Sequence, residues 1–305
     1  MKILVTGCAG FIGSHTCEYL LNNTEHDIYG IDNFDPYYDV SLKHDNIKLL
    51  SSFTKFKFSE DDIQTTNIIS QVKPDKIIHL ASMAGVRYSI ENPQKYFDVN
   101  VKGFIHILEE SVKNKVSKII YASSSSVYGK NKKLPFSETD VLDSCYSPYA
   151  CSKLTMEILA KTYYQLYGIS LIGMRFFTVY GPRGRPDMAP RKFMEAIKNG
   201  APINKYGDGS SYRDYTYVGD IVSGIIGLTN SDIECDVFNL GNDTPITLNE
   251  FIQTCENVIG KKAIINQMGD QKGDVPYTHA DISKARNAIG YNPKHSLKDG
   301  LLKTM

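Results

Sequence analysis

The stretch LVTGCAGFIGSH places three glycines between a short apolar run and the first amphipathic segment. Residues Lys2–Thr6 have the pattern of a buried strand, and residues 11–22 have helical periodicity. Gly7, Gly10 and Gly13 permit a tight turn, close backbone approach to a pyrophosphate and tight helix–strand packing. The helix N-terminus then favours the phosphate charge. Such a triplet could also be only a structural turn, but its place between a strand and a helix predicts a dinucleotide site.

An acidic residue at the end of the second expected strand supports this prediction. Asp32 follows Gly13 by nineteen residues, where a carboxylate would bond the adenine ribose hydroxyls and repel a 2′-phosphate. The pattern therefore favours NAD over NADP as cofactor, although Asp32 could also be an ordinary loop acid. After the third expected strand, Asp62 and Ile63 are predicted to contact adenine, unless they form an exposed acidic turn.

The first half of the chain alternates strand-like runs with longer helical segments. Strands are expected at 2–6, 27–31, 54–58, 76–80, 118–122 and 170–175, and helices near 11–22, 61–72, 93–113 and 149–167. That alternation predicts an α/β fold with a doubly wound parallel sheet. Residues 1–175 are therefore assigned to a Rossmann-type NAD-binding domain.

The second half is less regular and richer in glycine, proline and arginine. Strands are expected near 203–206, 214–217 and 237–240, and helices near 189–199, 218–228 and 247–258, with a final helix in LKDGLLKTM. We assign residues 176–305 to a smaller, mixed α/β substrate domain that is partly interleaved with the first.

Charge and cysteine usage argue against several other classes of protein. Lys and Arg number 34, as do Asp and Glu, so broad electrostatic binding to nucleic acid or an anionic membrane is not expected. The six cysteines show no metal-ligand spacing, which predicts no metal site and free thiols in a reducing cytoplasm. No apolar run approaches 18 residues, so neither a signal peptide nor a membrane span is expected.

The stretch SPYACSK carries Tyr149 and Lys153 four residues apart, after Pro148 at a first-turn position. This spacing puts both side chains on one helical face. A tyrosine pKa of ~10 is too high for a base at neutral pH, but an ammonium ~4 Å away would lower it to about 7. The YxxxK pattern also occurs by chance, but here it follows a serine cluster, ASSSSVYG, in a chain with a dinucleotide motif.

Together these motifs resemble the extended short-chain dehydrogenase/reductase superfamily, whose members use Ser or Thr, Tyr and Lys with a bound nicotinamide. Further stretches are similar to its sugar-nucleotide epimerase/dehydratase branch, and most closely to UDP-glucuronate 4-epimerases: HLASMAGVRYSIENPQKYFDVN, MRFFTVYGPRGRPDMA, YGDGSSYRDYTYVGDI, FNLGNDTP and GDVPYTHADISKA. The resemblance covers nearly the whole chain.

The resemblance implies roles for the matching residues. Ser124 would assist the sugar 4-OH, Tyr149 would be the acid/base, and Lys153 would bind the nicotinamide ribose and lower the pKa of Tyr149. The other residues expected to line the cofactor pocket are Phe11, Ile12, Asn33, Leu80, Ala81, Asn100 and Tyr121.

The nucleotide half of the substrate is also assigned by resemblance. Arg213 would bind the diphosphate, since an arginine fork suits phosphate oxygens, and Asp274 would lie near the ribose. Tyr206 would pack near uracil, or could be a core aromatic. Arg87 is assigned to the substrate site, although it could instead pair with Glu91 at helical spacing. His79, at the end of a buried strand, is expected to be a core residue.

Ser125 and Ser126 bear on the reaction. Related 4,6-dehydratases have Asp and Glu at these positions, and UDP-glucuronate decarboxylases have Glu in place of Ser126. Serine cannot perform that proton transfer at neutral pH, so the resemblance implies chemistry at C4 alone. For a uronate, the 4-keto intermediate would be a β-keto acid, whose carboxylate must be held firmly. Ser126, Thr178 and Arg185 match residues that could hold it, although Arg183, Arg185 and Arg191 could also form a solvated basic loop.

The implied activity is NAD-dependent epimerisation at C4 of a UDP-sugar, UDP-glucuronate to UDP-galacturonate, through a transient 4-keto intermediate. Two alternatives stay open: a 4-epimerase of neutral UDP-sugars (UDP-glucose or UDP-N-acetylglucosamine) and a catalytically silent NAD-binding scaffold. The resemblance also implies a homodimer formed through the helices expected at 93–113 and 149–167. Their apolar residues could serve either a dimer face or the intrachain core; they include Phe104, Ile107, Leu108, Met156, Leu159 and Tyr163.

Overall fold

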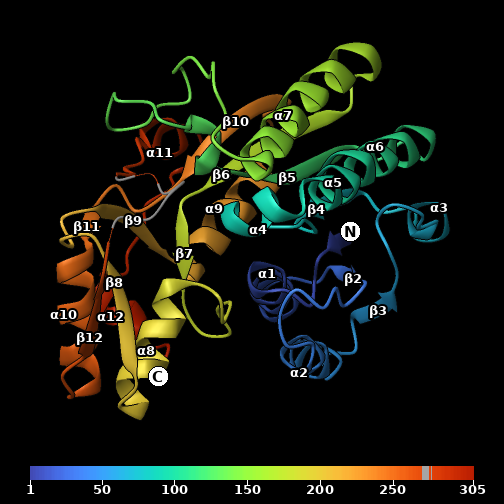
Figure 1. Ribbon diagram of the computed structural model, residues 1–305. Helices are drawn as coiled ribbons and strands as arrows, with labels where there is room; N and C mark the ends of the chain where they lie inside the picture. The colour runs from blue at the N-terminus through green and yellow to red at the C-terminus, as the bar shows by residue number, and fades with distance from the viewer. Residues whose placement is uncertain (270–274, 276) are drawn as a thin grey trace.

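The structure is a computed structural model that describes residues 1–269, 275 and 277–305. Over that part of the chain, the largest sheet has seven strands in the order β10-β6-β5-β4-β1-β2-β3 (Figure 1). The strands are β1 (Lys2–Thr6), β2 (Asp27–Asp32), β3 (Phe56–Glu60), β4 (Lys76–His79), β5 (Lys118–Ser124), β6 (Ser170–Phe176) and β10 (Cys235–Leu240). All their pairings are parallel, so the predicted doubly wound α/β fold is confirmed.

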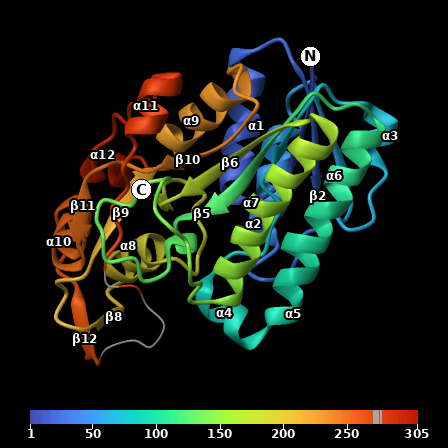
Figure 2. The same cartoon turned by 90° about the horizontal axis from the view of Figure 1, so that it is seen from above.

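Helices cover both faces of this sheet. The main ones are α1 (Phe11–Asn23), α3 (Ile68–Val72), α6 (Gly103–Lys113), α7 (Pro148–Tyr167) and α9 (Val218–Asn230). In Figure 2, α6 and α7 lie on one side of the sheet, and α1 and α9 lie on the other. Successive strand residues serve opposite cores: Ile3 and Val5 pack with α1 and α9, while Leu4 packs with α6 and α7. Burial on both faces explains the continuous apolar runs in the sequence.

The single helix predicted over 93–113 is interrupted. It consists of α5 (Pro93–Tyr96), a π-helical segment (Phe97–Lys102) and α6, and it is preceded by α4 (Val86–Glu91). The π-helical segment contains the buried Asn100, whose amide bonds both the N–H and the carbonyl of Met83, at 2.7 and 3.0 Å. The irregular turn therefore fixes the loop after β4, as π-helical turns often do near functional sites.

Two other differences lie between β2 and β4. The helix predicted at 61–72 begins only at Ile68, because Asp61 and Asp62 bond Thr66 and the N–H of Gln64 in local turns. Conversely, α2 (Ser41–Leu50) was not predicted. Its buried positions include Lys43 and Asn46, so its apolar periodicity is weak.

The second half forms smaller sheets beside the large one (Figure 1). Its strands are β7 (Thr178–Tyr180), β8 (Pro202–Tyr206), β9 (Tyr212–Tyr217), β11 (Pro245–Thr247) and β12 (Ile264–Met268), and its further helices are α8 (Ala189–Asn199), α10 (Leu248–Ile259), α11 (Ser283–Ile289) and α12 (Leu297–Leu302). β10 pairs with β6 in the large sheet, and α9 packs on that sheet. Segments of the second half therefore complete the fold of the first half. The short β7, β11 and β12 were not predicted.

The apolar residues predicted for α6 and α7 serve mainly the intrachain core. Phe104, Ile107, Leu108 and Met156 are buried against the sheet. Among the described helices, none combines the length and apolarity that crossing a bilayer requires. The described residues also contain no group of three or more His, Cys, Asp and Glu side chains placed to bind a metal ion.

Candidate active site

A cavity of about 420 Å³ opens at the carboxyl ends of the parallel strands, where the strand order reverses between β1 and β4. It brings together most of the residues predicted from the sequence: Gly7, Gly10, Phe11, Ile12, Gly13, Asp32, Asn33, Ile63, Leu80, Ala81, Ser124, Ser125, Ser126, Tyr149, Lys153, Thr178 and Arg185. These residues come from distant parts of the chain, so their convergence is a property of the fold.

The turn between β1 and α1 leaves no room for a side chain at Gly7 or Gly13. Gly7 has a φ of +71°, and a Cβ there would lie 2.7 Å from the nitrogen of Ala81. A Cβ on Gly13 would lie 2.1 Å from the carbonyl oxygen of Gly7. Gly10 is the N-cap residue of α1 and supplies no side chain to the first-turn N–H groups. The helix N-terminus therefore faces the cavity as a cradle suited to an anion.

Asp32 holds this turn from the end of β2. Its carboxylate accepts hydrogen bonds from the N–H groups of Ala9 and Phe34, at 3.2 and 2.9 Å. The pKa of Asp32 is raised because burial disfavours its charge, an effect that Lys43, 4.0 Å away, partly offsets. The residue is therefore part of the cavity wall and not an ordinary loop acid.

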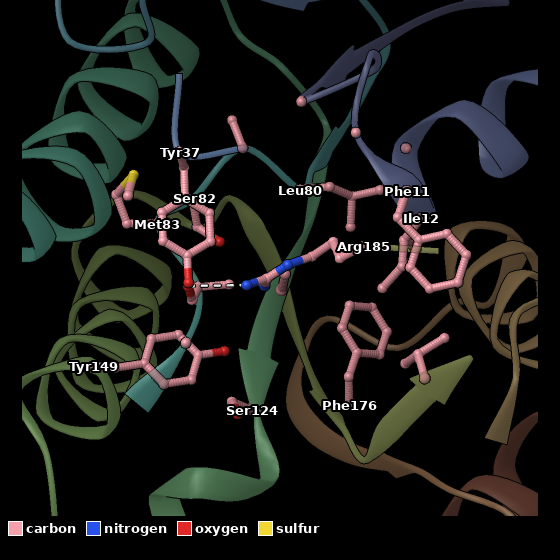
Figure 3. A pocket seen from close by; sticks show the side chains of 18 of the residues that line it. Phe11, Ile12, Tyr37, Leu80, Ser82, Met83, Ser124, Tyr149, Phe176 and Arg185 are labelled. Atoms are coloured by element: carbon pink, nitrogen blue, oxygen red, sulfur yellow. Dashed lines mark hydrogen bonds between the residues drawn. The ribbon is translucent and has the colours of Figure 1, made fainter. Parts of the chain in front are cut away.

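The helix α7 carries Tyr149 and Lys153 into the cavity from one of its faces. Ser147 caps this helix by accepting a hydrogen bond from the N–H of Ala150 at 3.1 Å. Ser124 ends β5 and accepts a hydrogen bond from the N–H of Ser126 at 3.1 Å. Figure 3 shows the Tyr149 hydroxyl projecting into the cavity near Ser124.

Lys153 is not among the groups that oppose the effect of burial on the pKa of Tyr149 in the chain itself, and its expected effect on Tyr149 stays a prediction. Burial raises the pKa of Tyr149, and the effects opposing it are a hydrogen bond with Ser124 and the charge of Arg185. The ammonium of Lys153 donates instead to the carbonyl of Ala122 at 2.8 Å. Burial also lowers the pKa of Lys153 to about 7, because its charge has lost its hydration.

Arg185 reaches the cavity from the segment after β7. Its guanidinium makes two hydrogen bonds with Asp187, from Nε at 3.0 Å and from Nη2 at 2.6 Å. Nη2 also donates to Ala84 at 3.3 Å, and the ring of Tyr37 lies 5.2 Å from Cζ (Figure 3). The Tyr37 hydroxyl donates to Asp187 at 3.1 Å. Arg185 is therefore an oriented, mostly buried group, and its assignment to a solvated loop is wrong.

The chain matches a known protein family over nearly its whole length. A family model described as GDP-mannose 4,6 dehydratase matches residues 4–304. The chain belongs to this family. It is 40% identical to a UDP-glucuronate 4-epimerase of Thermodesulfobacterium geofontis, over 99% of this chain and 94% of that protein. These matches confirm the predicted sugar-nucleotide epimerase/dehydratase family.

Solved structures of this family agree with the fold. The structure of UDP-glucuronic acid 4-epimerase from Bacillus cereus, in complex with UDP-glucuronic acid and NAD, superposes with a TM-score of 0.95 at 36% identity, covering 99% of this chain and 97% of that chain. The UDP-glucose 4-epimerase of Thermotoga maritima, solved with UDP-glucose, gives 0.92 at 31% identity, covering 100% and 97%. Epimerases named for different UDP-sugars therefore share the fold of this chain.

Three residues predicted for the cofactor pocket lie off the described cavity. Asp62 accepts a hydrogen bond from Asn33 at 3.0 Å, while its neighbour Asp61 lines the cavity. Asn100 is engaged with the backbone of Met83, as described above. Tyr121 is 1% exposed and packs on Phe104, with ring centroids 5.1 Å apart. The assignment of these three residues to cofactor binding stays a prediction; Asn100 bonds the backbone of Met83, which lines the cavity.

Three of the residues assigned to the nucleotide half of the substrate do not line the described cavity: Arg87, Tyr206 and Arg213. Arg87 of α4 is exposed, and its Cζ lies 5.8 Å from the ring of Tyr206 at the end of β8. No ion pair joins Arg87 to Glu91 in the described part of the chain. Arg213 lies in β9, and Asp274 lies outside the described residues. The two halves of the chain therefore meet at Arg87 and Tyr206.

Other arginines and His79 have structural partners. Arg183 bonds His15 and Glu18 of α1, and Arg191 bonds Glu195 at 2.6 Å. His79 is fully buried and hydrogen-bonded to Thr6 at 2.9 Å, as expected of a core residue.

Several cavity residues were missed from the sequence. Tyr37, Tyr38 and Lys43 follow β2, and Phe176 and Met188 flank the segment that carries Arg185. The aromatic pair in DNFDPYYD directly after Asp32 was an available signal, because loops at the carboxyl ends of parallel strands line such sites.

We expect Lys153→Met to stabilise the protein at neutral pH. Because burial lowers the pKa of Lys153 from 10.5 to about 7, folded-state stability is reduced at low pH and rises as pH increases between these values. Removing the buried ammonium should raise the free energy of unfolding at pH 7 by about 2 kcal/mol, after subtracting its hydrogen bond. Urea unfolding of cofactor-free protein at pH 7 and 9.5 measures the effect, which should shrink at the higher pH.

The matched control is Lys161→Met, an exposed lysine on the same helix, whose replacement should change stability by no more than about 0.5 kcal/mol. A Lys153→Met protein less stable than the wild type at pH 7 would contradict the prediction.

Proposed function

We propose that the protein is an NAD-dependent UDP-sugar 4-epimerase that interconverts UDP-glucuronate and UDP-galacturonate through a 4-keto intermediate. The observation that carries the proposal is the meeting of Ser124, Tyr149 and Arg185 in one cavity with the glycine turn. The family relatives named UDP-glucuronate 4-epimerase support it, since they match the chain over nearly its full length.

The cavity walls fit a dinucleotide. In this proposal the N-terminus of α1 binds the pyrophosphate, Asp32 bonds the adenine ribose hydroxyls, and Lys153 bonds the nicotinamide ribose. The charge of Asp32 would repel a 2′-phosphate, which favours NAD over NADP. Bound by these residues, NAD⁺ would supply the hydride acceptor and donor that epimerisation at C4 requires.

The chain's own residues exchange the proton of the sugar 4-hydroxyl. The Tyr149 hydroxyl is placed to exchange a proton with the sugar 4-oxygen, and Ser124 is placed to hydrogen-bond that oxygen. Because burial raises the pKa of Tyr149, the neutral phenol is favoured in the chain itself, and Ser124 and Arg185 are the groups that oppose this effect. Their removal should therefore raise the pKa of Tyr149 further and leave less of the phenolate that accepts the proton of the 4-hydroxyl.

The reaction should stop at C4. Ser125 and Ser126 line the cavity beside Ser124, and neither can serve as the acid or base that dehydration needs. The carboxylates that line the described cavity are Asp32, Asp35 and Asp61, which follow β2 and β3, three strands or more from β5 in the sheet. No described carboxylate in the lining is thus placed next to the catalytic serine.

A uronate carboxylate would lie between Ser126, Thr178 and Arg185. Two hydroxyl donors and a guanidinium stabilise its negative charge, which opposes its loss as carbon dioxide from the 4-keto intermediate. Arg87, Tyr206, Arg213 and Asp274 would hold the UDP half, at the meeting of the two halves of the chain. We assign residues 1–175 to cofactor binding and 176–305 to the UDP-sugar.

We also propose a cytoplasmic homodimer. The six cysteines are free thiols, which suits a reducing compartment. On α7, Ile158, Leu166 and Tyr167 remain 62%, 66% and 53% exposed, and an exposed apolar face of this kind suits pairing with the same face of a second copy. Light scattering of the purified protein measures the oligomeric state.

Incubation of the purified protein with UDP-glucuronate, UDP-glucose and UDP-N-acetylglucosamine tests the substrate. We expect UDP-galacturonate to form from UDP-glucuronate at a kcat/KM at least about tenfold above that for either neutral sugar, because one charge-assisted contact is worth about 1.5 kcal/mol or more. Preference for a neutral sugar would favour the rival 4-epimerase, and turnover of none would favour a silent NAD-binding scaffold.

Tyr149→Phe should retain NAD but lower kcat by about 10²–10⁴-fold, because general acid–base catalysis at C4 is lost. Product separation and NAD titration measure the two properties. Tyr146→Phe is the control, since Tyr146 is 42% exposed and does not line the described cavity. Near-normal turnover by Tyr149→Phe would exclude the mechanism.

Arg185→Ala should raise the KM for UDP-glucuronate at least about tenfold and release carbon dioxide during turnover, because one charge-assisted contact to the carboxylate is removed. Kinetics and trapping of ¹⁴CO₂ from labelled substrate measure both effects. Arg191→Ala, which loses only a bond to Glu195 and one to Gly184, is the control. Unchanged KM and no carbon dioxide would remove Arg185 from the carboxylate site.

A further inference from the structure

The face of α7 that carries Tyr149 and Lys153 continues one turn further to Glu157. Residues at i, i+4 and i+8 lie along one side of a helix, and here that side meets the end of β5. Lys153 donates to the carbonyl of Ala122, and the next residue along the strand, Ser123, donates its hydroxyl to Glu157. Two successive helix residues of this face thus bond the two strand residues that immediately precede Ser124.

Glu157 is itself fixed by the neighbouring strand. Arg175 of β6 donates to both carboxylate oxygens of Glu157, from Nε at 3.0 Å and Nη2 at 2.7 Å. In the parallel register Arg175 is the partner of Ser123, so one carboxylate joins α7, β5 and β6. The remaining guanidinium nitrogen, Nη1, donates to the hydroxyl of Tyr128 at 2.9 Å. Tyr128 lies in the turn that follows Ser124.

The side chains of Glu157, Arg175 and Ser123 are almost completely buried. Glu157 is 9% exposed, Arg175 is 4% exposed and Ser123 is 2% exposed. Removing two charges from water costs about as much free energy as their attraction returns, so apolar residues of similar volume are often as stabilising. A buried ion pair of this kind is therefore weak support for stability, and its position next to the reacting groups suggests another use.

We propose that Glu157 is a positioning residue for the 4-epimerase reaction: through Ser123 and Arg175 it holds α7 at a fixed distance from the end of β5, so that Tyr149 and Lys153 stay in register with Ser124. The inference rests on the proposed function, because it assigns these three residues to the reaction. Glu157 does not line the described cavity, so it acts through its neighbours and not on substrate.

The double variant Glu157→Leu, Arg175→Met separates positioning from stability. It replaces the ion pair by apolar side chains of similar size, so the thermal midpoint should stay within a few degrees of wild type, about 5 °C at most. We expect kcat to fall about 10–100-fold while KM changes less than about threefold, because misplacement by ~1 Å is enough for such a loss. A folded double variant with wild-type kcat would overturn the proposal.

Substitutions at Ser123 give a second test that leaves the ion pair intact. Ser123→Ala removes only the bond between Glu157 and β5, and kcat should fall about 3–10-fold with KM unchanged. Ser123→Thr keeps the hydroxyl donor and should restore most of the wild-type rate. If the alanine and threonine variants had equal kcat values, whether both were as fast as wild type or both were slow, positioning through this hydroxyl would be contradicted. This test holds even if the double variant failed to fold.

Hydrogen exchange supplies a readout that does not depend on turnover. In both defective variants, amides at 147–153 and 122–126 should exchange faster than in wild type, while those of α1 and β2 stay unchanged and NAD titration gives the same affinity within about threefold. Unchanged exchange at these segments would overturn the inference. If the wild-type protein turned over no UDP-sugar, the proposed function would fail, and this exchange pattern would still report whether Glu157 holds α7 to β5.

Discussion

The buried ammonium of Lys153 constrains the whole site. The residue is 1% exposed, and its hydrogen bond to the Ala122 carbonyl ties α7 to β5. A carbonyl compensates the lost hydration of a charge incompletely, so burial lowers the pKa of the lysine to about 7. Because burying this charge costs stability, other contacts must help to hold α7 against the sheet. The hydrogen bond from Ser123 to Glu157, one helical turn further on, is one of them. The contacts that place Lys153 beside the end of β5 therefore also bury a charge, which costs stability.

The elements nearest the site were predictable because their signals are local. β1 was predicted at its observed bounds, and α1 and α7 were predicted to within one residue at each end. A strand, a glycine turn and a helix follow one another in the sequence as they do in space, so the spacing of Gly7, Gly10 and Gly13 already specifies the cradle. The same holds for Tyr149 and Lys153, which share a helical face by spacing alone.

Residues whose place depends on distant partners were not predictable. Tyr121 was assigned to the cofactor pocket, and its ring packs on Phe104 on the face covered by α6 and α7. The orientation of Arg185 depends on Asp187, which in turn accepts a bond from Tyr37, 150 residues away in the chain. The amphipathic signal of α2 is weak because Asn46 buries an amide against the glycine turn, donating to Ala9 at 2.8 Å.

The charges around Arg185 relate the serines at positions 125 and 126 to the proposed uronate substrate. Related dehydratases have Asp and Glu at these two positions. Asp187 already accepts hydrogen bonds from Nε and Nη2 of the guanidinium. Since a guanidinium has five N–H donors, a substrate carboxylate could bind a remaining donor without displacing Asp187. An Asp or Glu at position 125 or 126 would then add a third negative charge around one cation, at a cost of about 1 kcal/mol or more even at an effective dielectric of about 20. In the proposed function, Ser125 and Ser126 would avoid that repulsion and supply neutral donors, so the residues that would exclude dehydration would also accommodate a uronate.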